Sequence, residues 1–179
     1  MIPGIQRAQA LVEFALVAPL LLLLLFGSVD LGGAYVIRLQ VANAARVGAR
    51  WASLHSGDVN YGWTPSATPA ENTIEGQVIY AGDTLTVVND DSHLAIDYYI
   101  WDQGTTNTVY CGRYSAAANS FVAATDAAGS PYTASQCAAV DNIVKVTVTY
   151  DYQPFTSILA DFSGPSFPVV SSAAFVIQS

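Results

Sequence analysis

The hydrophobic pattern of the chain begins with an almost uncharged stretch, "AQALVEFALVAPLLLLLLFGSVD", at residues 8–30. Between Arg7 and Asp30 only Glu13 carries a charge. As a helix that rises about 1.5 Å per residue, this segment would be roughly 33 Å long and would cross a bilayer core of about 30 Å. The pattern therefore predicts a membrane-spanning helix with a carboxylate near one end of the span.

The apolar pattern does not stop at the end of this segment. A secretory signal peptide is the alternative for such a start, but Glu13 directly before the leucine core is atypical of that class. The second half of the predicted helix is rich in Ala and Gly, which allow close approach of neighbouring helices. We therefore predict one continuous helix over 9–53. Its apolar positions recur at steps of three and four residues: Leu31, Tyr35, Leu39, Ala42, Ala45 and Ala49.

Two residues of the apolar segment need a physical explanation. Pro19 removes a backbone donor and clashes with the preceding turn, so we expect a kink or a lost hydrogen bond there. A carboxylate in hydrocarbon is unfavourable, so Glu13 is expected to pair with a cation on a neighbouring chain. The alternative is that its side chain reaches the nearby membrane interface.

After residue 54 the pattern changes. "HSGDVNYGWTPSATP" (55–69) is typical of a loop, and Thr68, Pro69 and Gly82 mark the ends of a short helix over 69–81. A period of two then predicts strands in a mainly antiparallel sheet. The residues between 115 and 136 are small and polar and favour a surface loop. The predicted strands are "DTLTVV", "LAIDYYIW", "TNTVYCGRY", "NIVKVTVTYDY" and "FPVVSSAAFVIQS".

Composition and charge narrow the classes of function. The chain of 179 residues is 52% hydrophobic but only 11% charged, well below the roughly 25% usual in soluble domains. Residues 1–52 carry four bases and two acids, whereas residues 53–179 carry two bases and twelve acids. Such an acidic C-terminal part argues against nucleic-acid binding, which needs a basic footprint. Contact with a membrane or with other copies is favoured instead.

The two cysteines, Cys111 and Cys137, both lie in the acidic part. If this part lies outside the cytoplasm, a disulfide between them is the expected state, and the alternative is two buried thiols. The disulfide would close the base of the loop predicted at 115–136.

No catalytic motif is present, and we predict neither enzymatic activity nor a cofactor. His55 and His93 are the only histidines, and no third ligand stands at a metal-site spacing. "NDDSHLAID" contains oxygen ligands of the kind calcium prefers, but it lacks the glycine and the glutamate of an EF-hand loop, so an ordinary hairpin turn is favoured. The residues concerned are Asn89, Asp90, Asp91 and Asp97.

Three aromatic residues share one predicted strand. Tyr98, Tyr99 and Trp101 must be divided between the two faces of the sheet, because side chains alternate along a strand. One face is expected in the core. The other is either ordinary surface or a contact for subunits or adhesion, since aromatic residues are enriched at interfaces.

The segment "AQALVEFALVAPLLLLLLFGSVDLGGAYVIRLQVANAARVGARWAS" resembles the N-terminal region of TadE-like pseudopilins of the tight-adherence (Tad/Flp) type IV pilus system. The resemblance implies cleavage by a prepilin peptidase between Ala8 and Gln9. The new amino group of Gln9 would then be the cation for Glu13 of a neighbouring chain. It also implies a pilin-like α+β fold, in which the second half of the helix packs on the sheet.

Together these observations predict a leader at 1–8, a membrane and filament helix at 9–53, and an extracytoplasmic domain at 54–179. The leading hypothesis is a pilin-like subunit, held in the inner membrane and then placed in an extracellular pilus or its priming complex. Its partners would be other copies or other pilins and the pilus assembly machinery. The alternatives are a single-pass surface binding module that does not polymerise and, less favoured, a membrane-anchored hydrolase.

Overall fold

A computed structural model describes residues 3–55, 73–82, 85, 90–102, 107–115, 118, 120–156 and 164–178, without the side chains of residues 3–8 and 102. The chain divides into two compact units. Unit 1 is Met1–Val36 with Tyr152–Phe167, and unit 2 is Ile37–Asp151 with Pro168–Ser179. The long first helix contributes residues to both.

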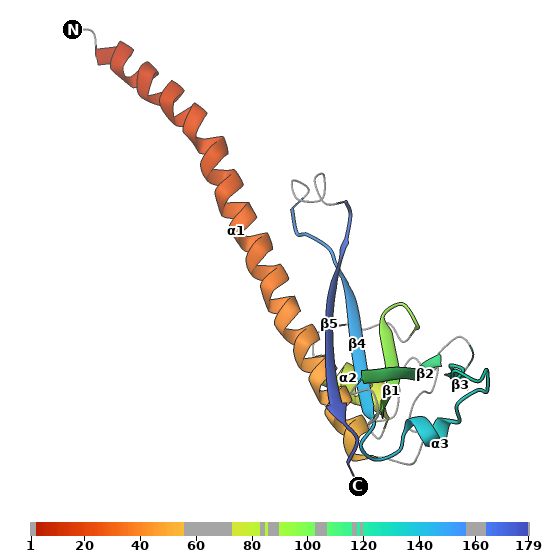
Figure 1. Ribbon diagram of the computed structural model, residues 1–179. Helices are drawn as coiled ribbons and strands as arrows, with labels where there is room; N and C mark the ends of the chain where they lie inside the picture. The colour runs from red at the N-terminus through yellow and green to blue at the C-terminus, as the bar shows by residue number, and fades with distance from the viewer. Residues whose placement is uncertain are drawn as a thin grey trace. The chain divides into compact units, whose positions relative to one another are not determined.

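The helices are α1 (Pro3–Leu54), α2 (Ile74–Gly82) and α3 (Ala134–Cys137). The strands are β1 (Leu94–Asp102), β2 (Asn107–Ser115), β3 (Ser120–Ala123), β4 (Ile143–Tyr152) and β5 (Phe167–Val176) (Figure 1). They form one sheet in the order β3-β2-β1-β4-β5. β1 pairs antiparallel with β2 and β4, and β2 pairs antiparallel with β3. The predicted α+β class, with a long N-terminal helix and a mainly antiparallel sheet, is confirmed.

The core of unit 2 lies between the second half of α1 and one face of the sheet. Period-two alternation explains β4, where Val144, Val146 and Val148 are fully buried while Lys145 and Thr147 lie on the other face. The helix contributes mainly small side chains, so its backbone approaches the strands closely. Its buried residues are Val41, Ala44, Ala45, Ala49 and Ala52.

At Gly48, α1 approaches its surroundings closely. A Cβ atom added there would lie 2.4 Å from Cγ2 of Val78 and 3.5 Å from Cγ1 of Val146, both fully buried side chains. We predict that Gly48→Ala lowers the free energy of unfolding by about 1–3 kcal/mol, because overpacking outweighs the gain in helix propensity. Urea unfolding of the detergent-solubilised chain would measure this.

Gly32 is the matched control for this substitution, because it lies in the same helix and an added Cβ meets nothing within 4 Å. Gly32→Ala should leave stability unchanged or raise it by up to about 1 kcal/mol. Equal effects of the two substitutions would contradict the close packing at Gly48.

The expected disulfide is present. Cys111 of β2 and Cys137 at the end of α3 are bonded, with their Cα atoms 5.7 Å apart. Both residues are fully buried. The bond joins two parts of the core of unit 2 that are 26 residues apart in sequence.

Several details differ from the sequence predictions. α1 begins at Pro3, within the predicted leader, and α2 begins at Ile74. The predicted cap at Thr68 and Pro69, the loop over 56–69 and most of the strand "DTLTVV" lie outside the described residues. The loop expected at 115–136 contains β3 and α3. α3 is stabilised by a capping box between Thr133 and Gln136.

Candidate assembly surface

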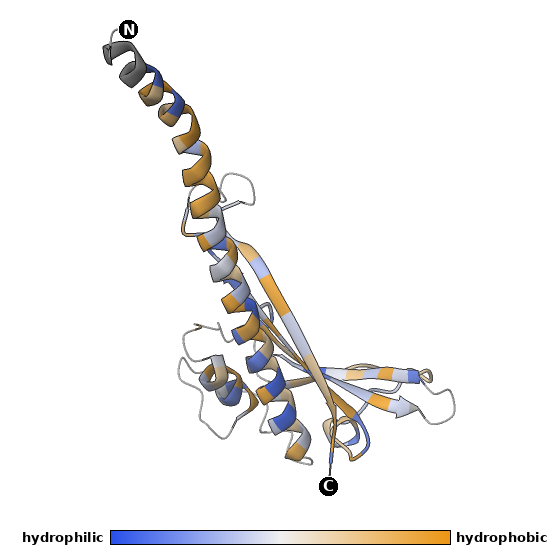
Figure 2. Ribbon diagram, turned by 90° about the vertical axis from the view of Figure 1, so that its left-hand side faces the viewer, coloured by the Kyte–Doolittle hydropathy of each residue, from blue (hydrophilic) through white to orange (hydrophobic). Residues whose placement is uncertain are grey.

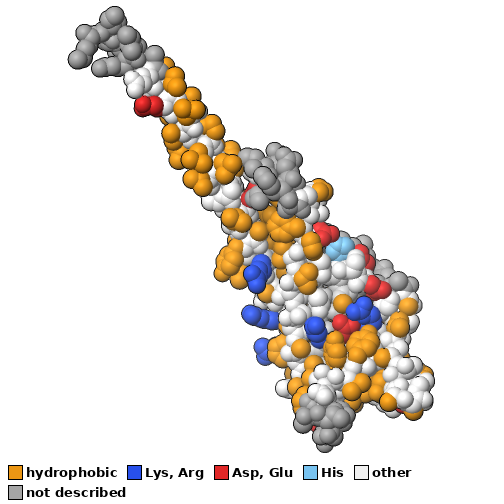
Figure 3. Space-filling model, turned by 45° about the horizontal axis from the view of Figure 1, so that its top comes forward, with side chains coloured by type: hydrophobic (Ala, Val, Ile, Leu, Met, Phe, Trp, Pro, Cys, Tyr) orange, Lys and Arg blue, Asp and Glu red, His pale blue; other side chains and the backbone are white. Residues whose placement is uncertain are grey.

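The first half of α1 presents an apolar surface that unit 1 leaves uncovered. Hydrophobic residues lie along the described N-terminal part of this helix (Figure 2), and their side chains form much of its surface in Figure 3. α1 is long and apolar enough to cross a membrane, and none of its most apolar window is buried. Such a surface is covered by lipid or by other protein when the molecule functions. The residues that expose 60% or more of their surface are Leu11, Val12, Phe14, Leu16, Leu20, Leu24, Leu31 and Tyr35.

Glu13 lies within this apolar surface. Its side chain is exposed, and its Oε1 atom accepts a long hydrogen bond of 3.5 Å from Nε2 of Gln9, one turn earlier. Among the described residues no cation forms an ion pair with Glu13. The side chains of Arg7 and Ala8 are outside the described residues, although both lie within α1. The charge on Glu13 therefore has no compensating charge in the described part of its own chain.

α1 continues as a helix through Pro19. The helical assignment alone does not test a kink, so the kink stays a prediction. A shallow apolar hollow of about 380 Å³ lies on the face of the helix between Phe14 and Leu25. Ala18 supplies its small side chain, and Phe14, Leu21, Leu22 and Leu25 form the remaining lining. A side chain of a neighbouring helix could fill this hollow.

A second carboxylate in α1, Asp30, lies in a different environment. It is 1% exposed and accepts hydrogen bonds from the backbone N–H of Phe155 (2.8 Å) and of Thr156 (3.2 Å) and from the Thr156 hydroxyl. The Tyr152 hydroxyl donates to the Asp30 carbonyl oxygen at 3.1 Å. Asp30 therefore fixes the chain after β4 against α1 within unit 1. The sequence around Asp30 shows its charge but contains no signal that predicts this role.

Gly33 allows this contact to form. A Cβ atom at this position would lie 2.8 Å from the Tyr152 hydroxyl oxygen. The helix thus combines one buried acceptor, Asp30, with one glycine that admits the tyrosine.

The helix that carries these features has a recognisable sequence. Residues 8–50 match the family model described as TadE-like protein. The resemblance inferred from the sequence is therefore confirmed for residues 8–50, the TadE-like segment. No curated protein and no solved structure matches the chain. The match ends within α1, so the sheet of unit 2 lies outside the TadE-like segment.

Three arginines lie along the second half of α1. Arg38, Arg46 and Arg50 are exposed, and multiples of four residues separate them, which places them on one side of the helix. In the described residues none of the three forms an ion pair. All three lie within the TadE-like segment, whereas the rest of the chain is acidic.

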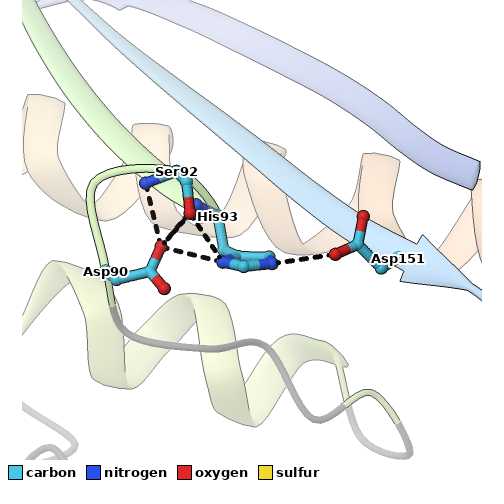
Figure 4. Close-up of polar contacts among 4 residues, drawn as sticks. All are labelled: Asp90, Ser92, His93 and Asp151. Atoms are coloured by element: carbon cyan, nitrogen blue, oxygen red, sulfur yellow. Dashed lines mark hydrogen bonds and ion pairs between the residues drawn. The ribbon is translucent and has the colours of Figure 1, made fainter.

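A polar cluster outside the TadE-like segment occupies the turn before β1 (Figure 4). Asp90 Oδ1 accepts hydrogen bonds from the N–H groups of Ser92 and His93, both at 2.9 Å. His93 Nδ1 lies 2.8 Å from Asp90 Oδ1, and its Nε2 lies 3.2 Å from Oδ2 of Asp151 on β4. These bonds are those of a well-formed turn joined to the neighbouring strand.

The other candidate calcium ligands that the structure describes also bond to protein groups. Asp91 accepts a hydrogen bond of 2.7 Å from the Ser115 hydroxyl, and Asp97 accepts one of 3.0 Å from Arg113 Nε. Asn89 lies outside the described residues. Within the described ranges no group of three or more His, Cys, Asp or Glu residues is placed to hold a metal ion. Asp90, Asp91 and Asp97 thus each accept hydrogen bonds from protein groups.

The pKa values of the cluster follow from its geometry. Partial burial raises the pKa of Asp90, but hydrogen bonds from Ser92 and His93 outweigh it and lower that pKa to about 2. The hydrogen bond to Asp90 raises the pKa of His93 above 6.5, against the opposing effect of burial. Asp151 raises it further.

These shifts predict a pH dependence of stability. The raised pKa of His93 stabilises the fold below about pH 6.5, and this contribution is lost as the pH rises through the folded-state pKa. The lowered pKa of Asp90 stabilises the fold above about pH 3.8, and this contribution is lost as the pH falls toward about 2. We expect the free energy of unfolding to fall between about pH 6 and pH 9, by less than about 1 kcal/mol because solvent screens the cluster.

Urea unfolding across this pH range would measure the effect. In His93→Gln the fall should disappear, whereas in the control His55→Gln it should persist. A fall that persists in His93→Gln would assign the pH dependence to another group.

The aromatic residues of β1 divide between the faces of the sheet. Tyr98 is 6% exposed and contacts Phe121 edge-on in the core. Tyr99 and Trp101 lie on the opposite face, where Trp101 is 43% exposed and Tyr99 contacts the Tyr110 ring. This outer face is distinct from the apolar surface of the TadE-like segment.

Proposed function

We propose that this chain is a structural, pilin-like subunit of a Tad-type pilus. Its N-terminal helix would hold it in the inner membrane and then pack against helices of other subunits in a filament or its priming complex. The observation that carries the proposal is the uncovered apolar surface of α1, which coincides with the TadE-like segment at 8–50. A helix that only anchored a domain would not need a carboxylate within that surface.

The proposal includes processing of the N-terminus. A prepilin peptidase would cut between Ala8 and Gln9, and the new amino group of Gln9 would neutralise Glu13 of a neighbouring chain. In an uncut chain Arg7 or the intact N-terminus of a neighbour would take this role. The absence of an ion pair to Glu13 among the described residues supports a partner on another chain.

The charge distribution supports insertion into the inner membrane first and transfer of the helix into a filament afterwards. Arg7 on the cytoplasmic flank agrees with the positive-inside rule, with the acidic C-terminal part outside. Arg38, Arg46 and Arg50 then lie on the far side, which is unfavourable for a permanently anchored protein. Extraction of the helix into a filament would remove this conflict and place the three arginines beside acidic neighbours.

Electron microscopy of the chain produced together with a prepilin peptidase and Tad assembly proteins would test the proposal. We expect filaments, or pili that contain the chain, detected by antibody labelling. A chain that stays in the membrane fraction as a detergent-soluble monomer and never enters pili would overturn the proposal. That outcome would favour a membrane-anchored binding module.

A further inference from the structure

No helix or strand of the described residues covers the outer face of the sheet in unit 2, which lies opposite the core. Two shallow hollows of about 380 and 350 Å³ lie side by side on it and share Ile143 of β4. Trp101, Asp141 and Val176 form the rest of the first hollow. Tyr99, Thr108, Lys145 and Ala174 form the rest of the second.

Two charged residues flank Ile143 on this face. Asp141 precedes it by two residues and Lys145 follows it by two. Lys145 lies roughly 7 Å from Ile143 along β4, at about 3.3 Å per residue, whereas Asp141 lies in the turn before β4, with a φ of 71°, and lines the first hollow. Because each hollow is lined by Ile143 and by one of the two charged residues, all three residues face the same side.

Neither charge is neutralised within the described residues. Asp97 is the cross-strand neighbour of Lys145, but its carboxylate is paired with Arg113 Nε at 3.0 Å. In the described part of the chain Lys145 and Asp141 form no ion pair. The two hollows together therefore offer one cation, one anion and apolar side chains between them.

We propose that this outer face binds a second copy of the same chain, with Ile143 on a two-fold axis. A two-fold interface requires a surface that is complementary to itself. Rotation about Ile143 brings Lys145 of one copy opposite Asp141 of the other, twice, while the apolar hollows meet at the centre. Exposed aromatic side chains, here Tyr99 and Trp101, are enriched in such interfaces. The inference does not depend on the proposed pilus function, because it uses only the sheet of unit 2.

Thiol cross-linking of the full chain in detergent tests the axis. With Ile143→Cys, the two thiols meet across the axis, and a short bismaleimide should link the copies. Thr147→Cys is the matched control, since it lies on the same strand and face but about 26 Å from its symmetry mate. Cys111 and Cys137 are bonded to each other and do not react. Equal linking at positions 143 and 147 would overturn the proposal. Copies that associate only through α1 would not hold position 143 closer to its mate than position 147.

Charge exchange tests the pairing. In the Ile143→Cys background, Lys145→Glu alone or Asp141→Lys alone should reduce the linked dimer about tenfold, because each places like charges opposite each other. A mixture of the two variants should restore it, because one copy then carries two anions and the other two cations. Thermal unfolding would confirm that each variant is folded. A mixture of folded variants that stays as weak as the separate variants would overturn the pairing.

Discussion

Glu13→Gln is expected to leave unit 2 folded while the amount of chain in filaments falls at least about tenfold. The substitution keeps the shape of the side chain and removes its charge, and truncating one member of a buried ion pair costs about 3–5 kcal/mol. Glu13 is exposed and has only a 3.5 Å bond to Gln9 within its own chain, so its own fold does not require the charge. Quantitative immunoblotting of sheared filaments and of membranes would measure the effect.

Glu13→Asp is the control for this experiment. It retains the charge on a shorter side chain and should assemble better than Glu13→Gln. If Glu13→Gln assembled at the normal rate and amount, pairing between chains would be refuted. The side chain would then be explained by contact with the membrane interface.

Replacing both cysteines, as Cys111→Ala with Cys137→Ala, should lower the free energy of unfolding by about 2–5 kcal/mol. The bond closes a loop of 26 residues and joins β2 to α3. Without it the unfolded chain gains conformational freedom, and the buried side chains at both positions lose contacts. Chemical unfolding of the two proteins under oxidising conditions would give the difference.

A reductant provides the control for the cysteine experiment. It should destabilise the natural chain and have no effect on the double variant. A natural chain that is equally stable with and without reductant would show that the disulfide is absent or contributes nothing.

The elements that were predictable from the sequence are those with a strong local period. Steps of three and four residues marked the helix that the structure places at Pro3–Leu54, and alternation of Val144, Val146 and Val148 with polar residues marked β4. β3 was not predictable from the sequence, because the small residues between 115 and 136, mainly Ser and Ala, show no clear hydrophobic period. The register of β3 is set by its pairing with β2 from Gly112 to Ser115, which is tertiary information.

The assembly surface was only partly predictable. Glu13 stood out because a carboxylate in an apolar run violates a local rule. Asp30 did not, because its partners include backbone N–H groups about 125 residues later in the chain. Every residue except proline carries such a donor, so no residue type marks the partner of a buried acceptor in advance.

The hydrogen bonds of Asp30 can form only late in biosynthesis. Its sequence separation from Thr156 is 126 residues, so these protein donors cannot reach it until most of the chain has been made. Contacts of such long range form late, because the intervening loop must close first. During synthesis the polypeptide therefore carries an apolar helix whose second carboxylate still lacks its donors. A product truncated before residue 155 lacks these donors altogether, so water would have to solvate the Asp30 carboxylate in their place.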